Sequence, residues 1–245
     1  MGSSLWVSLS GAIAQLREID VVANNVANAD TVGFKRERLA FESALETAVA
    51  DLGVGRAAGA PGRVFAAQAP GGIDMTAGAI QRTGGDLDVA IAGDGFFEVQ
   101  TPNGTRYTRA GAFALSPDGT LVTQNGDAVL GEGGPIGAGD GRLVIRANGD
   151  VVDGDETPVG TLRLVRFEDP NALEPEGANL LRPREGALPL DAERVELVEG
   201  ALERSNVQPV AELAGLVLLQ RAFETSMRAI QSDDETTQRL IEEMS

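Results

Sequence analysis

Apolar residues at the N-terminal end of this 245-residue chain follow a helical spacing. They recur at alternating intervals of four and three residues, at Leu5, Leu9, Ala12, Leu16, Ile19, Ala23 and Val26. Residues three and four apart share one face of an α-helix, so the pattern predicts a long helix with a narrow apolar seam. A seam of this kind is stable in water only when another helix covers it.

The C-terminal end repeats the alternation. Its seam positions are Leu213, Leu216, Gln220, Phe223, Met227, Ile230, Asp234, Thr237, Ile241 and Met244. Pro209 suits the first turn of a helix, where its missing N–H is not needed. Asp234 and Thr237 interrupt the stripe, which is typical of a frayed or solvent-lined final section.

The residues between the two seams form short alternating or β-branched runs. We predict strands at 87–91, 96–100, 106–109, 121–123, 143–146 and 161–167, separated by turns rich in Gly, Pro and Asn-Gly pairs. The connections leave no room for crossover helices, so the strands must pair antiparallel. A doubly wound nucleotide-binding fold is therefore excluded.

Together these patterns predict an α+β fold. We expect long N- and C-terminal helices paired as a coiled-coil-like stem, with a central antiparallel all-β module between them. The expected boundaries are 1–35 and 200–245 for the stem, 36–82 for an extended or irregular linker region, and 83–199 for the β module. Residues 53–72 are the most Gly-, Ala- and Pro-rich part of that linker.

The composition excludes much of enzymology. The chain has no His and no Cys, so it cannot build a Ser-His-Asp or Cys-His nucleophile, a disulfide, or a zinc site of Cys and His ligands. Its net charge of −17 argues against nucleic acid or an anionic membrane as partner. Lys35 is the only lysine, so a phosphate-binding loop of the pattern GxxxxGK[ST] is impossible in this chain. We expect no cofactor.

The N-terminus does not have the pattern of a secretory signal peptide, since its first cationic residue is Arg17. The sequence also lacks an apolar run of 18 residues that could span a bilayer, so we expect no direct membrane insertion.

Three groups of acidic residues are candidate sites for chemistry. The glycine-rich stretch 131–141 faintly resembles one copy of a calcium-binding repeat, but such repeats work in stacks, and the acidic stretch 150–156 lacks the ligand spacing of a calcium-binding hand. We interpret both as turns and expect no metal. Asp86, Asp88 and Asp94 are the only sensible carboxylates for a glycan-cleaving enzyme, although aspartate beside strands is common in turns.

Asn24, Asn25 and Asn28 lie where the first helix should end. Asparagine is a poor residue for the interior of a helix, because its amide competes with backbone hydrogen bonds. Three of them in five residues can cap the helix or form an amide network with a neighbouring helix or subunit. The residues alone leave both interpretations open.

Four blocks of the sequence resemble the flagellar rod and hook protein family. The first is VVANNVANADTVGFK at 21–35, and the second is LDVAIAGDGFFEV at 87–99. YTRAG at 107–111 and GALERSNV at 200–207, followed by QRAFE, complete the match in the same order. The signature positions are Asn24, Asn25, Asn28, Gly33, Phe34, Gly95, Phe96, Phe97, Tyr107, Thr108, Arg109, Gly111, Ser205, Asn206, Val207, Gln220 and Arg221.

Within the family, the short chain and the segments at 74–78 and 129–136 look most like the proximal rod protein of the F type. The start at Ser4-Leu5-Trp6 and the segment at 33–38 are more similar to the distal rod protein, which is the alternative. The hook protein usually carries an additional outer domain, for which this chain has no room.

The resemblance implies a structural protein of the flagellar basal body rather than an enzyme. It implies that like subunits and other rod proteins assemble into a helical tube that crosses the periplasm, transmits torque and surrounds an export channel. The terminal helices would line the tube, with their apolar seams at the subunit interfaces. The resemblance also implies export by the flagellar type III apparatus. In the free monomer we expect disordered or loosely helical ends on a folded β module.

Overall fold

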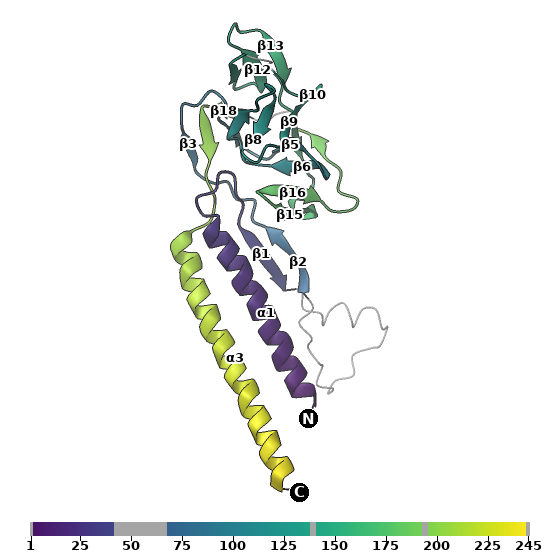
Figure 1. The fold of residues 1–245 in the computed structure, drawn as a ribbon, viewed down its shortest axis with the longest axis vertical. Helices are drawn as coiled ribbons and strands as arrows, with labels where there is room; N and C mark the ends of the chain where they lie inside the picture. The colour runs from purple at the N-terminus through teal and green to yellow at the C-terminus, as the bar shows by residue number, and fades with distance from the viewer. Residues whose placement is uncertain (1, 42–67, 138–140, 193–195, 244–245) are drawn as a thin grey trace. The chain divides into compact units, whose positions relative to one another are not determined.

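The computed structural model describes residues 2–41, 68–137, 141–192 and 196–243 (Figure 1). Within these residues, one long helix lies at each end of the chain and strands occupy the region between them. The helices are α1 (Gly2–Ala27) and α3 (Pro209–Glu243), and η1 (Pro170–Ala172) is a single 3-10 turn. Neither long helix is apolar enough over a sufficient length to cross a membrane, judged on the described residues.

The strands are short. They are β1 (Glu37–Phe41), β2 (Gln68–Ile73), β3 (Ile80–Arg82), β4 (Val89–Ala92), β5 (Phe96–Thr101), β6 (Gly104–Thr108), β7 (Phe113–Leu115), β8 (Leu121–Thr123), β9 (Ala128–Gly131), β10 (Gly134–Pro135), β11 (Leu143–Ile145), β12 (Asp150–Asp153), β13 (Pro158–Thr161), β14 (Leu164–Arg166), β15 (Leu173–Gly177), β16 (Leu180–Pro183), β17 (Leu190–Asp191), β18 (Glu196–Glu199) and β19 (Ala201–Glu203).

The chain divides into two compact units. The first, which we call the helical unit, holds 1–27, 37–71 and 208–245. The second, which we call the β-module, holds 28–36 and 72–207. The chain therefore passes from the helical unit into the β-module at residue 28, returns at residue 37, and enters the β-module again at residue 72.

In the helical unit, α1 and α3 lie side by side and contact each other, and β1 contacts α1 (Figure 1). Pro209 is the first residue of α3, as its fixed φ and missing N–H favour. Glu212 lies in the same first turn, where a carboxylate is stabilised by the helix dipole.

The expected coiled-coil-like stem is wrong. The described residues contain one helix at each end with a mostly β region between them, and the heptad positions of the two helices do not form a continuous buried seam. Ala12 is buried, but Leu16, Leu213 and Met227 each leave more than a third of their surface exposed. A coiled coil buries its seam at every turn. The spacing correctly gave two helices, whereas burial of their seams depends on neighbours that spacing does not specify.

The β-module is built from antiparallel pairs. Its largest sheet has the strand order β15-β16-β6-β5-β9-β8-β7, and smaller pairs join β18 to β4 and β19 to β3. The β5–β6 hairpin forms its centre, with Val99 opposite Arg106. All residues of β5 except Gln100 are buried, whereas β6 is half-buried over its first three residues and buried at Tyr107 and Thr108.

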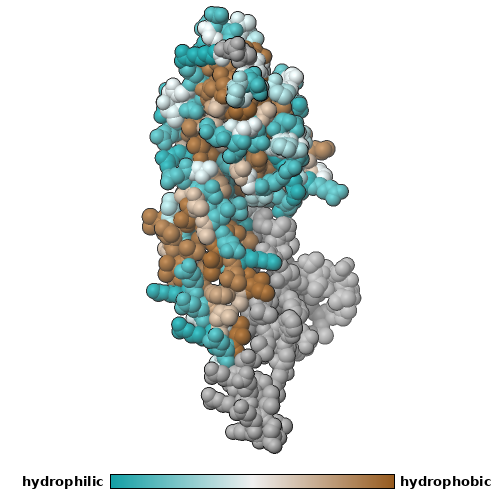
Figure 2. Space-filling view, viewed as in Figure 1, coloured by the Kyte–Doolittle hydropathy of each residue, from teal (hydrophilic) through white to brown (hydrophobic). Residues whose placement is uncertain are grey.

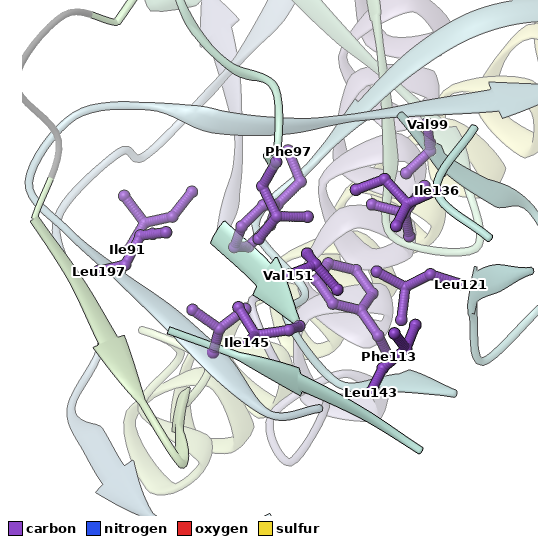
Figure 3. Packing of buried hydrophobic residues seen from close by; sticks show 13 residues of the cluster. Ile91, Phe97, Val99, Phe113, Leu121, Ile136, Leu143, Ile145, Val151 and Leu197 are labelled. Carbon is purple, nitrogen blue, oxygen red and sulfur yellow. The ribbon is translucent and has the colours of Figure 1, made fainter. Parts of the chain in front are cut away.

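Two apolar clusters form the hydrophobic core of the β-module. The larger gathers side chains from β4, β5, β7, β8, β9, β11 and β12 (Figure 3). In it, Phe97 meets Phe113 edge to face, with ring centroids 5.1 Å apart. The smaller contains Phe96, Tyr107 and Phe167, and the Tyr107 and Phe167 rings are also edge to face. Thus both faces of β5 are covered.

Two predicted features lie partly or wholly outside the described residues. Most of the Gly- and Pro-rich linker at 53–72 lies outside them, as do residues 138–140 of the glycine-rich stretch. The acidic stretch 150–156 forms β12 and the turn that follows it.

Candidate functional site

A buried group of three charged residues lies within the β-module. Glu203, the last residue of β19, accepts a hydrogen bond from Lys35 Nζ at 2.7 Å on Oε1 and one from Arg109 Nε at 2.9 Å on Oε2. All three side chains are almost fully buried, at 3% exposure or less. We call Lys35, Arg109 and Glu203 the charged triad.

Each member of the charged triad also binds backbone. The Gly78 N–H donates to Glu203 Oε1 at 2.8 Å, and Lys35 Nζ donates to the Thr76 carbonyl at 2.9 Å. Arg109 Nη1 donates to the carbonyls of Gly93 and Gly95, in the turn between β4 and β5. The buried charges are therefore hydrogen-bonded as well as paired, which is the condition under which burial of charge is tolerated.

The triad contains two cations and one anion, and the pKa values reflect this imbalance. Burial alone would raise the pKa of Glu203, but attraction to Arg109 and Lys35 outweighs it and lowers that pKa. Burial lowers the pKa of Lys35, and repulsion by Arg109 adds to that effect, although the hydrogen bond to Glu203 opposes it. The site therefore favours the charged form of Glu203, whereas burial works against the charged form of Lys35.

Two glycines allow the backbone to approach the triad. Gly33 has φ of +67°, and a Cβ there would lie 2.4 Å from the Ala110 nitrogen. A Cβ on Gly78 would lie 1.8 Å from the Arg204 carbonyl oxygen. No side chain fits at either place, so the loop after α1 and the strand β3 region can reach the triad only with glycine there.

Asn206 ties three further backbone segments together. Its Oδ1 accepts from the Arg36 N–H at 2.8 Å, while its Nδ2 donates to the carbonyls of Asp74 and Thr76. The Asp74 N–H in turn donates to the Arg36 carbonyl at 2.8 Å. A single amide therefore joins the segments around residues 36, 75 and 206.

Asn25 and Asn28, in the asparagine cluster at the end of α1, make different hydrogen bonds. Asn25 is buried and pairs with the backbone of Glu37 in both directions, donating from Nδ2 to its carbonyl at 3.0 Å and accepting its N–H at 2.9 Å. Asn28 accepts hydrogen bonds from Thr31, through its carbonyl and its side chain. Asn28 thus bonds within the turn that follows α1, while the amide of Asn25 pairs with β1 of the same chain rather than with the neighbouring helix or subunit that the sequence left open. Burial raises the pKa of the Glu37 carboxyl.

Most other signature residues are structural parts of the β-module. Phe96 and Phe97 point to opposite clusters, and Tyr107 packs with Phe96. A Cβ on Gly111 would meet the Val89 carbonyl at 1.7 Å. The remaining positions make local contacts: Thr108 Oγ1 donates to the Asn179 carbonyl and accepts the Ala110 N–H, and Ser205 Oγ accepts the Val207 N–H. Phe34 and Val207 are buried, whereas Asn24, Gln220 and Arg221 are exposed.

The predicted helical seams are only partly buried. Among seam residues whose side chains are described, Ile19, Val26, Leu216, Phe223 and Ile230 are half-buried, and Ala23 is exposed. Side chains outside the seam are more exposed still: Val210 at 82% and Leu218 at 66% lie on α3 with Leu213 and Val217. Apolar surface over the helices is visible in Figure 2. We call Val210, Leu213, Val217 and Leu218 the exposed α3 face.

The charged triad could not be recognised from the sequence. Arg109 is a signature residue, Lys35 and Glu203 lie inside signature blocks, and Gly78 ends the segment at 74–78, but no sequence pattern connects them. One signal was available: Lys35 is the only lysine in a chain whose other basic residues are arginines. The partners could not be found, because they lie 168 and 94 positions apart from Glu203 along the chain.

The three aspartates of the enzyme alternative have ordinary roles. Asp86 accepts an ion-pair hydrogen bond from Arg142 Nε at 2.8 Å, and Asp88 accepts from the Thr83 hydroxyl. Asp94 is exposed in the turn before β5. In the part of the chain that the structure describes, no group of three or more acidic side chains is arranged to hold a metal ion.

Comparison with known proteins gives family matches at three places. The chain matches the flagella basal body rod protein model at 5–35, the flagellar hook protein FlgE/F/G D1 domain at 90–161, and the flagellar basal body rod FlgEFG protein C-terminal model at 198–243. Each matched segment contributes one member of the charged triad.

Full-length relatives agree. The basal-body rod protein FlgF of Caulobacter vibrioides is 37% identical over 246 residues, which cover 100% of this chain and 98% of the relative. FlgG of Bacillus subtilis is 34% identical over 260 residues, covering 97% of each chain, and FlgF of Mesorhizobium japonicum is 33% identical over 234 residues, covering 92% and 91%. The glycan hydrolase alternative has no support. The chain belongs to the flagellar basal-body rod protein family, and it is a structural protein of the rod rather than an enzyme.

Proposed function

We propose that this chain is the proximal rod subunit of the F type, which assembles through its terminal helices into the helical tube that transmits torque and surrounds the export channel. The observation that carries the proposal is the exposed α3 face. Monomeric proteins leave single apolar side chains exposed, but a run of them on one face of a helix marks a binding surface.

The spacing of the exposed α3 face suits contact with further helices. Val210, Leu213 and Val217 recur at intervals of three and four, and Leu218 lies beside them. Full burial of one such side chain stabilises a contact by roughly 1.5–3 kcal/mol. Repeated at every subunit, contacts of that size hold a rigid tube, and the seam residues on α1 and α3 would contribute to the same interfaces.

Chain length supports the F type over the distal type. The alignment to the Caulobacter FlgF runs over 246 positions and covers 100% of this 245-residue chain, so that relative inserts almost no residues into it. The alignments to FlgG from Bacillus subtilis and Buchnera aphidicola run over 260 and 262 residues at 97% coverage of this chain. The FlgG proteins therefore carry extra residues where this chain has none.

The partners that follow from this proposal are like subunits, neighbouring rod proteins and, during export, the flagellar type III apparatus. The net charge of −17 supports solubility of the free monomer while its apolar helix faces have no partners.

The test of assembly uses two charge-adding variants in a strain that lacks the gene. Leu218→Glu places a carboxylate on the exposed α3 face, and we expect loss of the protein from purified basal bodies together with loss of motility. Gln231→Glu adds the same charge at an exposed polar position of α3 and should restore both. Full motility of the Leu218→Glu strain would contradict assembly through this face.

The position in the rod needs a separate experiment. An epitope inserted between Pro102 and Asn103, in the exposed turn that joins β5 to β6, would mark each subunit without touching either helix. Antibody labelling of purified basal bodies near the inner-membrane end would support the F type. Labelling next to the hook would instead favour the distal type.

A further inference from the structure

We infer that the charged triad is a clasp, closed by Glu203, which holds three separate stretches of the chain on the β-module and releases them together. The inference concerns the folded monomer and goes beyond its place in the rod. It follows from the contacts of one carboxylate, from the charges around it and from the course of the chain.

Both oxygens of Glu203 are used, and their donors come from distant parts of the sequence. Oε1 receives Lys35 Nζ and the Gly78 N–H, while Oε2 receives Arg109 Nε. The Glu203 backbone carbonyl also accepts the Gly33 N–H at 2.7 Å. One residue therefore joins the loop after α1, the segment before β3 and the strand end at Arg109.

The charges make Glu203 the decisive member. If Lys35 is neutralised, Arg109 and Glu203 remain as a balanced buried pair. If Glu203 is neutralised, two buried cations remain with no anion hydrogen-bonded to them, and only the weaker attraction of Asp74 acts on Lys35. Loss of a partner that leaves a buried charge uncompensated is strongly destabilising. Glu203→Gln should therefore have a much larger effect than Lys35→Met, although each removes one charge.

The course of the chain explains why the release would be local. The stretches that the triad and Asn206 fasten are 28–36, the segment that begins at residue 72, and the segment that ends at Val207. They contain all four points at which the chain passes between the β-module and the helical unit. The triad's hydrogen bonds join its own side chains to each other and to loop backbone, and they are not part of the ladders that pair β5 with β6 and β9. The clasp can therefore open while the sheet keeps its core, as local unfolding units do.

The reactivity of the Lys35 amine can report whether the clasp is open. Lys35 is the only lysine, so the α-amino group is the only other primary amine in the chain. In the closed clasp Lys35 is buried, and an amine-acylating reagent can reach it only when the clasp opens. Cleavage after arginine places Lys35 on a short peptide that mass spectrometry can quantify, with the α-amino group as internal reference.

The experiment compares purified full-length protein with three variants. In Glu203→Gln we expect Lys35 to be acylated about a hundredfold faster, the fold-change that corresponds to loss of a buried partner. The amides of Gly33, Gly78 and Arg36 should exchange hydrogen faster by a similar factor. Lys35→Met should raise amide exchange by less than about tenfold. Glu196→Gln, at an exposed glutamate of β18, is the matched control and should change neither.

Two results would overturn the clasp. Acceleration at Gly78 alone, with Lys35 still protected, would mean that the stretches are held independently. Equal acceleration of the β5 and β6 amides would mean that the sheet opens with them. If Glu203→Gln does not fold, Asn206→Ala tests the same point with less damage, because it removes only the bonds to Arg36, Asp74 and Thr76. It should expose Lys35 about tenfold more, whereas faster exchange at Arg36 alone would contradict the inference. Neither failure would affect the rod assignment.

Discussion

The β-module and the helical unit treat their apolar residues differently. In the β-module, Phe97, Leu121 and Val129 have no exposed surface. In the helical unit, Val210 and Leu218 leave most of their surface exposed, on a helix that is 35 residues long. The module thus buries its apolar surface within the chain, whereas the helices leave part of theirs exposed. Under the proposed function, this exposed surface is what assembly would bury.

The largest contrast should come from the same substitution made in each region. Leu121→Ala removes a fully buried side chain from the larger cluster and should lower the free energy of unfolding by about 2–5 kcal/mol. Leu218→Ala removes a side chain that is already exposed and should change it by less than about 0.5 kcal/mol. Urea unfolding measures both, with near-ultraviolet circular dichroism of Tyr107 following the β-module for Leu121→Ala and far-ultraviolet circular dichroism following the helices for Leu218→Ala.

An equal loss in the two variants would break the comparison, since it would mean that α3 buries Leu218 within the monomer. A small loss for Leu121→Ala would mean that the module's core collapses around the missing side chain, and Phe97→Ala would then serve as a second test of the same cluster.

A backbone position should give the next largest effect. Gly33→Ala forces a side chain into a left-handed conformation and against the backbone of Arg109 and Ala110. We expect a loss of at least about 1–3 kcal/mol in the β-module. Gly126→Ala is the matched control, because its φ is also positive but open space surrounds it. If the two substitutions cost the same, strain alone explains the effect, and the close approach at Gly33 has no role.

The sequence was sufficient for the parts of the fold that depend on local pattern. Alternation and Asn-Gly turns predicted strands in the region where β5, β6 and β8 lie, and Pro209 marked the start of α3. Local pattern does not specify what covers a surface. The heptad spacing therefore predicted a buried stem, whereas Leu16 and Leu213 are exposed.

The charged triad shows the same limit for the site. Each of its residues falls inside a signature block, but the bonds that join them span 168 and 94 positions of the chain. Only the fold brings such residues together. The asparagine cluster could be recognised as a hydrogen-bonding group from the sequence, but its partner could not, although Asn25 bonds to Glu37 only 12 positions away.

Acidification should change the contributions of Glu203, in the β-module, and Glu37, in the helical unit, to stability in opposite directions. The pKa of Glu203 lies below its unfolded value of about 4.3, so the stability that it adds is complete above that value and is lost as pH falls through the folded pKa. Burial raises the pKa of Glu37 in the helical unit, so Glu37 favours folding in acid and loses that contribution as pH rises. Each of these two carboxyls can change the slope of the free energy of unfolding against pH by up to about 1.4 kcal/mol per pH unit.

Unfolding of variants between pH 7 and pH 3 tests both signs. Relative to the unmodified protein, Glu203→Gln should lose less stability on acidification, and Glu37→Gln should lose more. Tyr107 reports on the β-module and Trp6, which lies in α1, reports on the helical unit by fluorescence. Parallel curves for all three proteins would show that neither carboxyl has a shifted pKa in the folded state.

The smallest effect should come from an ion pair in the helical unit. Arg228 and Glu224 are one helical turn apart on α3, with nitrogen and oxygen 3.7 Å apart and both side chains more than half exposed. Water screens such a pair, so Arg228→Ala should change the free energy of unfolding by less than about 0.5 kcal/mol. The Lys35–Glu203 pair joins the same kinds of charge under almost complete burial. A loss for Arg228→Ala in the free monomer that approached the loss for Glu203→Gln would mean that α3 is already covered there, and the helical unit would then be as closed as the β-module.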